Sequence, residues 1–296
     1  MNGAATFTTV RANGLDFEVL TAGEGDNLAL CLHGFPEHAL SWRAQIPALV
    51  DLGYRVWAPN QRGYGNTLPR PKNVVDYEMQ HLIDDVAALI DASGARRVTL
   101  IAHDWGGAVA WMYALRPPRP IERLVIMNVP HPAILRARLR DSSAQKLRSW
   151  YFLFFQLPVL PELLLGAGHA RAIGRVFTQT ATNKARFTTD ILEVYRDQAS
   201  RPGVLTAMLN WYRAAPRGMR AQLKLGVPVI DVPTMMVWGE ADAALGKETT
   251  YGTDAYVSNL RINYLPGISH WVQQDAPDEV NALLQSFLSE PAVQEA

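Results

Sequence analysis

The segment AHDWGG, residues 102–107, places an acidic side chain among small residues at the spacing of a nucleophile elbow. This elbow is a tight turn between a strand and a helix, with small residues two positions before and after the nucleophile. Ala102 and Gly106 occupy those positions around Asp104, so a carboxylate stands where a serine is usual. An aspartate at a helix start can also be a simple N-cap, so its partners decide its interpretation.

Two later strand ends supply such partners. With this kind of elbow, the order along the chain is nucleophile, acid, histidine. The strand-like VPTMMVWG is followed by Asp242, with Glu240 as a second candidate acid, and RINYLPG is followed by His270. Asn128 follows another strand-like segment, but an amide cannot carry the negative charge that stabilises an imidazolium. We therefore expect Asp242 to orient His270, with Glu240 ranked second.

A carboxylate nucleophile suits attack on a saturated carbon that bears a leaving group. Its usual pKa of about 4 keeps it ionised at neutral pH, so it needs no base for activation. Attack would give an alkyl ester of Asp104, and His270 would take a proton from the water that hydrolyses it. The oxyanion of that step needs two backbone N–H donors, which we expect from Trp105 and from Phe35. Phe35 precedes a proline, and a cis peptide bond is compatible with that pair.

The rest of the chain predicts an α/β fold with a mostly parallel sheet flanked by helices. Strand-like and helix-like segments alternate, which is typical of parallel sheets covered on both faces. FTTVRANG and LDFEVLTAG predict a hairpin that turns at Asn13-Gly14. The expected buried strands are LALCLHG, YRVWAP, RRVTLIAH, ERLVIMNV, VPTMMVWG and RINYLPG, and the expected helices are SWRAQIPALVDLG, MQHLIDDVAALIDASG, WGGAVAWMYALR, a helix near ETTYGTDAYVS, and DEVNALLQSFLSE.

This alternation breaks in the middle of the chain. Helical, aromatic-rich segments without a buried strand fill the region from about residue 132 to 225. We expect a first part of the α/β core in residues 1–131, a helical cap insertion in residues 132–225, and a second part of the core in residues 226–296. An insertion after a core strand would lie over the carboxyl ends of the sheet, where open α/β proteins bind ligands.

Composition limits the classes of binding partner and the cellular location that we expect. Lys plus Arg and Asp plus Glu each number 28, which gives no reason to expect nucleic acid or an acidic membrane as a partner. Cys31, the single cysteine, lies in an apolar run and excludes an intramolecular disulfide or a multi-cysteine zinc site; we expect no metal and no cofactor. The N-terminus lacks signal-peptide features. The apolar stretch WYFLFFQLPVLP is too short and too broken to span a bilayer, so we expect a cytoplasmic protein.

Four motifs in order along the chain now match a known family. HGFPE at 33–37, HDWGG at 103–107, WGEAD at 238–242 and GISHW at 267–271 together resemble the α/β-hydrolase fold epoxide hydrolases, with haloalkane dehalogenases as close cousins. The resemblance covers nearly the whole chain. Within the insertion, SWYFLFFQLPVLPE holds Tyr151 and NWYRAAPR holds Tyr212, and both look like segments whose tyrosines activate the epoxide oxygen.

The resemblance implies an enzyme that converts a hydrophobic small-molecule epoxide and water to a vicinal diol. An epoxide opens to a basic alkoxide that needs an acid such as tyrosine, whereas a halide needs only N–H donors. The tyrosine pair favours the epoxide, and a haloalkane dehalogenase that uses the same Asp104 is the alternative. Fluoroacetate dehalogenases favour an arginine where Trp105 stands, and a serine esterase is contradicted by Asp104. A non-catalytic binding protein would be expected to have lost a triad member. A homodimer stays open.

Overall fold

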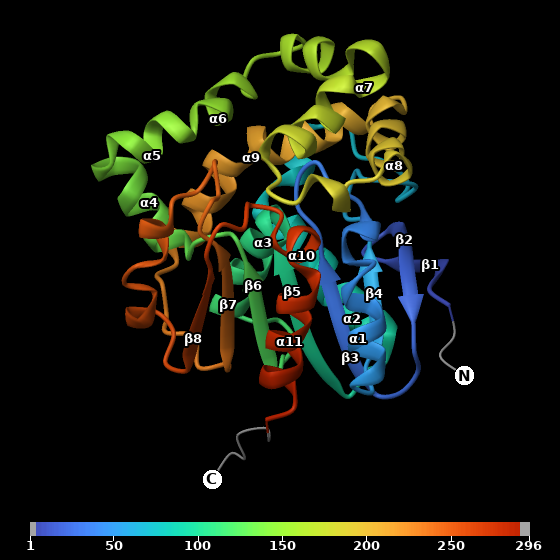
Figure 1. Ribbon diagram of the computed structural model, residues 1–296, viewed down its shortest axis with the longest axis vertical. Helices are drawn as coiled ribbons and strands as arrows, with labels where there is room; N and C mark the ends of the chain where they lie inside the picture. Colours follow the sequence, from blue (N-terminus) through green and yellow to red (C-terminus); the bar gives the residue numbers. More distant parts are fainter. Residues whose placement is uncertain (1–3, 291–296) are drawn as a thin grey trace.

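The computed structural model describes residues 4–290, which form an eight-stranded sheet with helices on both faces (Figure 1). The strand order is β1-β2-β4-β3-β5-β6-β7-β8. The β1–β2 and β2–β4 pairs are antiparallel, and the other neighbouring pairs are parallel, so the predicted α/β fold is confirmed. The strands are β1 (Thr6–Ala12), β2 (Leu15–Ala22), β3 (Asn27–Leu32), β4 (Arg55–Pro59), β5 (Arg97–His103), β6 (Arg123–Met127), β7 (Thr234–Gly239) and β8 (Leu260–Leu265).

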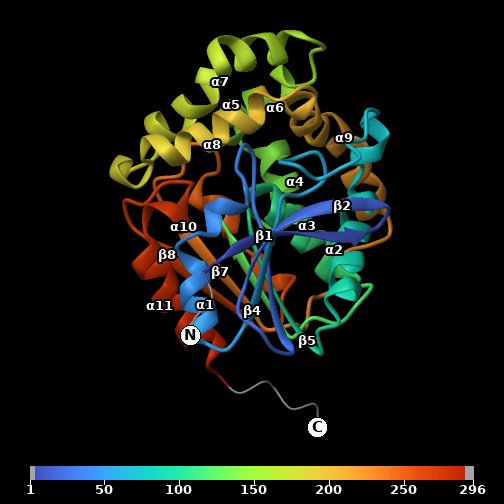
Figure 2. The ribbon, with the colours of Figure 1, turned by 90° about the vertical axis from the view of Figure 1, so that its right-hand side faces the viewer.

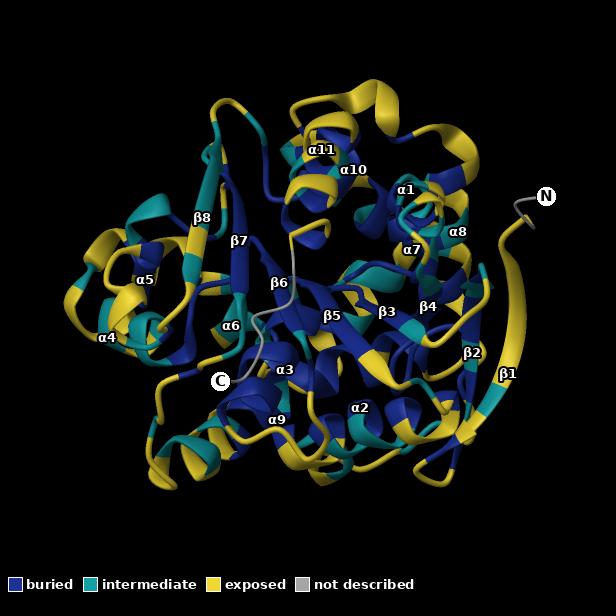
Figure 3. Cartoon of the chain, turned by 90° about the horizontal axis from the view of Figure 1, so that it is seen from below, coloured by how far each residue is buried: buried dark blue, intermediate teal, exposed yellow. Residues whose placement is uncertain are grey.

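The central strands are mostly apolar because helices cover both sides of the sheet. Strands β3, β5, β6 and β7 are buried almost throughout, whereas the edge strand β1 is mostly exposed (Figure 3). Helices α2 and α3 lie on one face and α1 and α11 on the other, so the core has two parts (Figure 2). The helices that flank the sheet are α1 (Gln45–Asp51), α2 (Met79–Ser93), α3 (Asp104–Leu115), α10 (Val272–Asp275) and α11 (Pro277–Leu288).

The predicted hairpin is present between β1 and β2. Asn13 has a φ of 44° and Gly14 a φ of 74°. A two-residue turn with positive φ at both positions matches the twist of the flanking strands, and Asn-Gly is the pair that adopts it at least cost.

The predicted helix near ETTYGTDAYVS is wrong. The structure has two short 3₁₀ turns there, Lys247–Thr250 and Thr253–Ala255. The hydroxyls of Thr249 and Thr253 donate to backbone carbonyls three residues earlier, at 2.6 and 2.7 Å, and Gly252 has a φ of 87°. Threonine side chains that bond locally to the backbone compete with helix formation, and the left-handed Gly252 lies between the two turns and keeps them from joining into one helix.

Between β6 and β7 the chain forms only helices, which we call the α4–α9 segment. It lies across one end of the sheet, and Figures 1 and 2 show this from two sides. Within residues 4–290, no helix is both long enough and apolar enough to cross a bilayer. The helices of the segment are α4 (Pro132–Asp141), α5 (Ser143–Arg148), α6 (Trp150–Phe154), α7 (Leu160–Thr180), α8 (Thr189–Ser200) and α9 (Val204–Lys224).

Candidate active site

Asp104 lies at the junction of β5 and α3, in the turn that the sequence predicted. It follows β5 directly and begins α3 with a φ of 47°. Few residues with a Cβ adopt this left-handed region, and aspartate is among those that tolerate it. The chain around the turn has no room for larger residues. A Cβ on Gly106 would lie 2.3 Å from the Leu32 carbonyl oxygen, and one on Gly34 would lie 2.5 Å from the Asp104 side chain.

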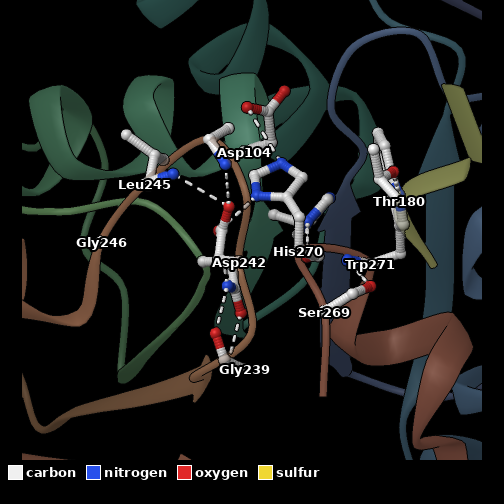
Figure 4. Close-up of polar contacts among 12 residues, drawn as sticks. Asp104, Thr180, Gly239, Asp242, Leu245, Gly246, Ser269, His270 and Trp271 are labelled. Atoms are coloured by element: carbon white, nitrogen blue, oxygen red, sulfur yellow. Dashed lines mark hydrogen bonds and ion pairs between the residues drawn. The ribbon is translucent and has the colours of Figure 1, made fainter. Parts of the chain in front are cut away.

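Three of the predicted side chains converge at this turn. Figure 4 shows His270 between Asp104 and Asp242. The Nδ1 atom of His270 is 2.6 Å from Asp242 Oδ2, and its Nε2 atom is 3.5 Å from Asp104 Oδ2. The other oxygen of Asp104, Oδ1, accepts a hydrogen bond of 2.8 Å from the Phe35 N–H. The two carboxylate oxygens of Asp104 therefore have different surroundings.

Asp242 is held by hydrogen bonds in addition to its contact with His270. Its Oδ1 atom accepts from the N–H groups of Ala244 and Leu245, at 2.7 and 2.9 Å. Its side chain is fully buried. Glu240, the second candidate acid, pairs with Lys247 instead. The structure thus brings Asp242, and not Glu240, to the histidine.

Asn128 contributes to the site in a way that the sequence did not reveal. Its side-chain amide donates to Asp242 Oδ2 at 2.8 Å and to the Gly239 carbonyl at 3.3 Å. Its side-chain oxygen accepts from the Gly239 N–H at 2.9 Å. The amide therefore joins the end of β6 to the end of β7 and fixes the orientation of the Asp242 carboxylate. Its φ of 45°, unusual for a residue with a Cβ, accompanies this placement.

A second buried group, Glu37 and His103, lies behind the triad. The Nδ1 atom of His103 is 2.8 Å from Glu37 Oε2, and its Nε2 atom is 2.9 Å from the His270 carbonyl oxygen. Glu37 Oε2 also accepts from the Gly34 N–H at 2.8 Å. Burial opposes the charge on Glu37, but His103 and the Gly34 N–H outweigh it and hold the pKa of Glu37 below its usual value. Both residues lie within the motifs HGFPE and HDWGG, yet their contact is visible only in the fold.

The surroundings of Asp104 and His270 shift the pKa of each toward the charged form. Burial alone would raise the pKa of Asp104, but the contact with His270, the nearby His103 and the Phe35 N–H together hold it below its usual value. Burial would lower the pKa of His270, but the carboxylates of Asp242 and Asp104 raise it well above its usual value. Each shift favours the charged form of its group, and the contact between Asp104 and His270 contributes to both shifts.

Asp104 faces a cavity of about 520 Å³ that Tyr151 and Tyr212 also line. Tyr151 belongs to α6 and Tyr212 to α9, and their ring centroids are 6.1 Å apart. Burial first, and then the charge of Asp104, raise the pKa of both tyrosines, so both are neutral phenols at neutral pH. Apolar residues supply much of the remaining lining, among them Val129, Leu135, Phe152, Ala215, Met219 and Leu223.

The last two predicted site residues are Phe35 and Trp105, whose N–H groups are expected to bind the oxyanion. Phe35 donates its N–H to Asp104 Oδ1 at 2.8 Å, and the Phe35–Pro36 peptide bond is cis. Trp105 follows Asp104 in the first turn of α3, and its indole packs edge-on against Tyr212 with ring centroids 5.0 Å apart. The roles of the Phe35 and Trp105 N–H groups as oxyanion donors both stay predictions.

Comparison with known proteins agrees with this geometry. Residues 28–277 match the family described as alpha/beta hydrolase fold. The chain is 37% identical over 294 residues to Epoxide hydrolase 4 of Homo sapiens. The alignment covers 97% of this chain and 80% of the relative. It is 37% identical over 281 residues to the AB hydrolase superfamily protein YfhM of Bacillus subtilis, with 94% of this chain and 96% of the relative covered.

A solved structure gives the same result. The epoxide hydrolase of Bacillus megaterium in complex with an inhibitor superposes with a TM-score of 0.88 at 27% identity, covering 96% of this chain and 100% of that one. Fold, motif order and relatives therefore agree, and the chain belongs to the epoxide hydrolases of the alpha/beta hydrolase fold family.

Proposed function

We propose that the protein hydrolyses a hydrophobic epoxide to a vicinal diol through an alkyl ester of Asp104. The observation that carries the proposal is the unequal environment of the two Asp104 oxygens. The Phe35 N–H binds Oδ1, while Oδ2 lies 3.5 Å from His270 Nε2, and the carboxyl group lines the same cavity as two neutral tyrosines. The names of the relatives support an epoxide as the substrate.

In the first step, Oδ2 of Asp104 attacks one carbon of the epoxide ring. A carbon–oxygen bond to the carboxylate forms as the ring carbon–oxygen bond breaks, which gives the covalent ester. The ring oxygen leaves as a developing alkoxide, and a phenol of Tyr151 or Tyr212 donates its proton while the other donates a hydrogen bond. Because both phenols are neutral at neutral pH, both are available as donors.

In the second step, water attacks the ester carbonyl carbon of Asp104. The ester carries no charge, so one of the two carboxylates that raise the pKa of His270 is lost, and the ring gives up its proton more readily. Neutral His270, oriented by Asp242, then takes a proton from the water. Oδ1 becomes the oxyanion and accepts from the N–H groups of Phe35 and Trp105. The intermediate then collapses: the bond between the carbonyl carbon and the ester oxygen breaks, the leaving alkoxide takes the second proton of the water to complete the diol, and Asp104 is again a carboxylate. The proton that His270 gave up before the attack returns to the tyrosinate, so all groups regain their starting protonation.

This scheme assigns a function to the α4–α9 segment. We propose that residues 132–225 act as a cap that carries Tyr151 and Tyr212, and that residues 1–131 and 226–296 form the core that carries the triad. The apolar lining of the cavity suits a hydrophobic substrate, since apolar surface buried on binding is stabilising.

Isotope labelling tests the ester. In a single turnover with excess enzyme in oxygen-18 water, the diol should contain no heavy oxygen, and the Asp104 peptide should gain it. Heavy oxygen in the first diol with none in the peptide would mean that water attacks the epoxide directly, and the ester would be refuted. Haloalkane hydrolysis would use the same nucleophile, so diol and halide release should be scored separately on matched epoxides and haloalkanes. Halide release without diol formation would favour the dehalogenase alternative.

A further inference from the structure

The outer edge of the α4–α9 segment carries an unusual concentration of exposed apolar side chains. Of 16 exposed large hydrophobic residues in the described part of the chain, 8 lie between residues 147 and 164. Leu153 is 77% exposed, Leu163 65% and Trp150 61%. We call this surface the apolar rim and define it as Trp150, Leu153, Leu157, Leu160, Leu163 and Leu164.

The rim is a surface and not the edge of a core. Figures 1 and 2 agree that the chain from α6 to the start of α7 runs along the outermost side of the segment, away from the sheet. The backbone of α7 is kinked at residues 167–170, and beyond the kink Ile173 and Phe177 are fully buried, so only the part of α7 before the kink belongs to this surface. Concentrated exposed apolar surface of this kind marks an interaction site, since soluble surfaces rarely retain it.

Basic side chains precede the rim. Residues 136–148 contain five basic side chains and a single acidic one, Asp141, although the whole chain is balanced at 28 and 28. We call the five the basic flank: Arg136, Arg138, Arg140, Lys146 and Arg148. Within the described residues, Arg136 and Arg138 form no ion pair, Arg140 pairs only with its neighbour Asp141, and Arg148 reaches Glu248 at 3.4 Å. The zero net charge of the whole chain thus hides a local excess of positive charge beside the rim.

We propose that the apolar rim and basic flank dock the protein on an anionic lipid surface. An exposed apolar helix face with adjacent Lys and Arg lies in the headgroup region, where apolar side chains enter the acyl boundary and basic ones attract anionic lipids. Trp150 suits the headgroup level, as tryptophans do at membrane interfaces.

A second copy of the chain matches this surface less well. Residues 149–166 contain one acidic residue, Glu162, and Arg213 already binds its carboxylate at 2.7 and 3.0 Å. The rim therefore offers no free carboxylate to the basic flank of a partner. Two rims in contact would bury apolar surface but leave ten basic side chains, five from each copy, without added acidic partners.

The rim also lies beside the cavity. Leu135, Arg136 and Leu139 of α4 line the cavity, as do Tyr151 and Phe152 of α6. Docking would thus place a wall of the cavity at the lipid surface, where a hydrophobic epoxide concentrates. This last point rests on the proposed function, whereas the docking itself does not.

Vesicle flotation of the full chain tests the docking. The wild-type protein should float with vesicles of phosphatidylcholine and phosphatidylserine, and markedly less with phosphatidylcholine alone. The variant Leu153→Gln/Leu163→Gln should lower the partition coefficient on mixed vesicles by about tenfold, because two inserted leucines are lost. The matched control is Leu225→Gln/Val229→Gln, since these residues are 64% and 52% exposed in the chain between α9 and β7. It should float like the wild type.

Failure to float with mixed vesicles, or an equal loss in both double variants, would overturn the proposal. Sedimentation without lipid tests whether a second copy of the chain binds the rim instead. A wild-type dimer that Leu153→Gln/Leu163→Gln converts to a monomer, without vesicle binding, would identify the rim as a contact between copies. Urea unfolding midpoints confirm that both variants fold. Diol formation from a water-soluble epoxide should be equal in all three proteins, and its absence from all of them would refute the proposed function without altering the flotation result.

Discussion

Replacing Tyr212 by phenylalanine removes one of the two phenols that the mechanism assigns to the epoxide oxygen. The ring is 3% exposed and packs against Trp105, Phe35 and Phe155, so phenylalanine should keep the packing and lose only the hydroxyl. A hydrogen bond to a charged group contributes about 1.5–3 kcal/mol, which corresponds to ester formation roughly 10- to 150-fold slower.

The same reasoning applies to Tyr151, and the double variant tests both. Tyr151→Phe should slow ester formation by a similar factor. Tyr151→Phe/Tyr212→Phe should slow it by more than either single change, although the two losses are not expected to multiply because both phenols act on one oxygen. Because burial and Asp104 raise the pKa of both phenols, the wild-type rate of ester formation should not fall between pH 7 and 9. Rapid quenching followed by intact-protein mass spectrometry measures the ester directly.

Tyr195 supplies a matched control. It is fully buried on α8, it donates to Gln274 Oε1 at 2.9 Å, and it does not line the cavity. Tyr195→Phe should lower the free energy of unfolding by about 1 kcal/mol and leave ester formation unchanged. Ester formation at the wild-type rate in the double variant, or an equal loss in Tyr195→Phe, would refute the reasoning.

Three further predictions concern the residues around the nucleophile. His270→Gln should still form the ester of Asp104 but hydrolyse it slowly, so a substrate adduct should be visible by mass spectrometry; lost activity with no adduct would contradict the role. Asn128→Gly keeps the backbone at a φ of 45° but deprives Asp242 of a donor; it should slow ester hydrolysis by about tenfold at an unchanged rate of ester formation, and parallel loss of both steps would point to misfolding instead. Glu37 has a lowered pKa in the fold, so its stabilising effect is present above its ordinary value of 4.5 and is lost as the pH falls through the lower folded value; denaturation midpoints should show this decline as the pH falls below 4.5, and Glu37→Gln should flatten it.

The elbow and the triad could be predicted because they depend on local or ordered features. The small size of Gly106 and Ala102 indicates a crowded turn. The roles of Asp242 and His270 could be predicted because each follows a strand and the two come in the expected order along the chain. The fold class followed from the alternation of apolar segments, which reflects a sheet covered on both faces.

The supporting contacts could not be predicted in this way. Asn128 and Asp242 are 114 residues apart, and Glu37 and His103 are 66 apart, so each pair exists only because neighbouring strand ends meet. A side-chain amide or a loop glutamate has the same appearance in the sequence whether it faces solvent or a buried partner. The failed helix in ETTYGTDAYVS has a local cause, since threonine hydroxyls compete there for backbone carbonyls.

Strands β6 and β7, between which the α4–α9 segment is inserted, are direct neighbours in the sheet. Met127, the last residue of β6, is paired with Val237 of β7. The segment therefore begins and ends at neighbouring strands of the sheet. Its length and sequence can change without altering the register of the sheet. On the proposed mechanism, substrate preference can thus diverge while the triad of the core stays constant, as long as the segment keeps Tyr151 and Tyr212. Chimaeras that exchange this segment between relatives should fold whenever the two strand ends are kept.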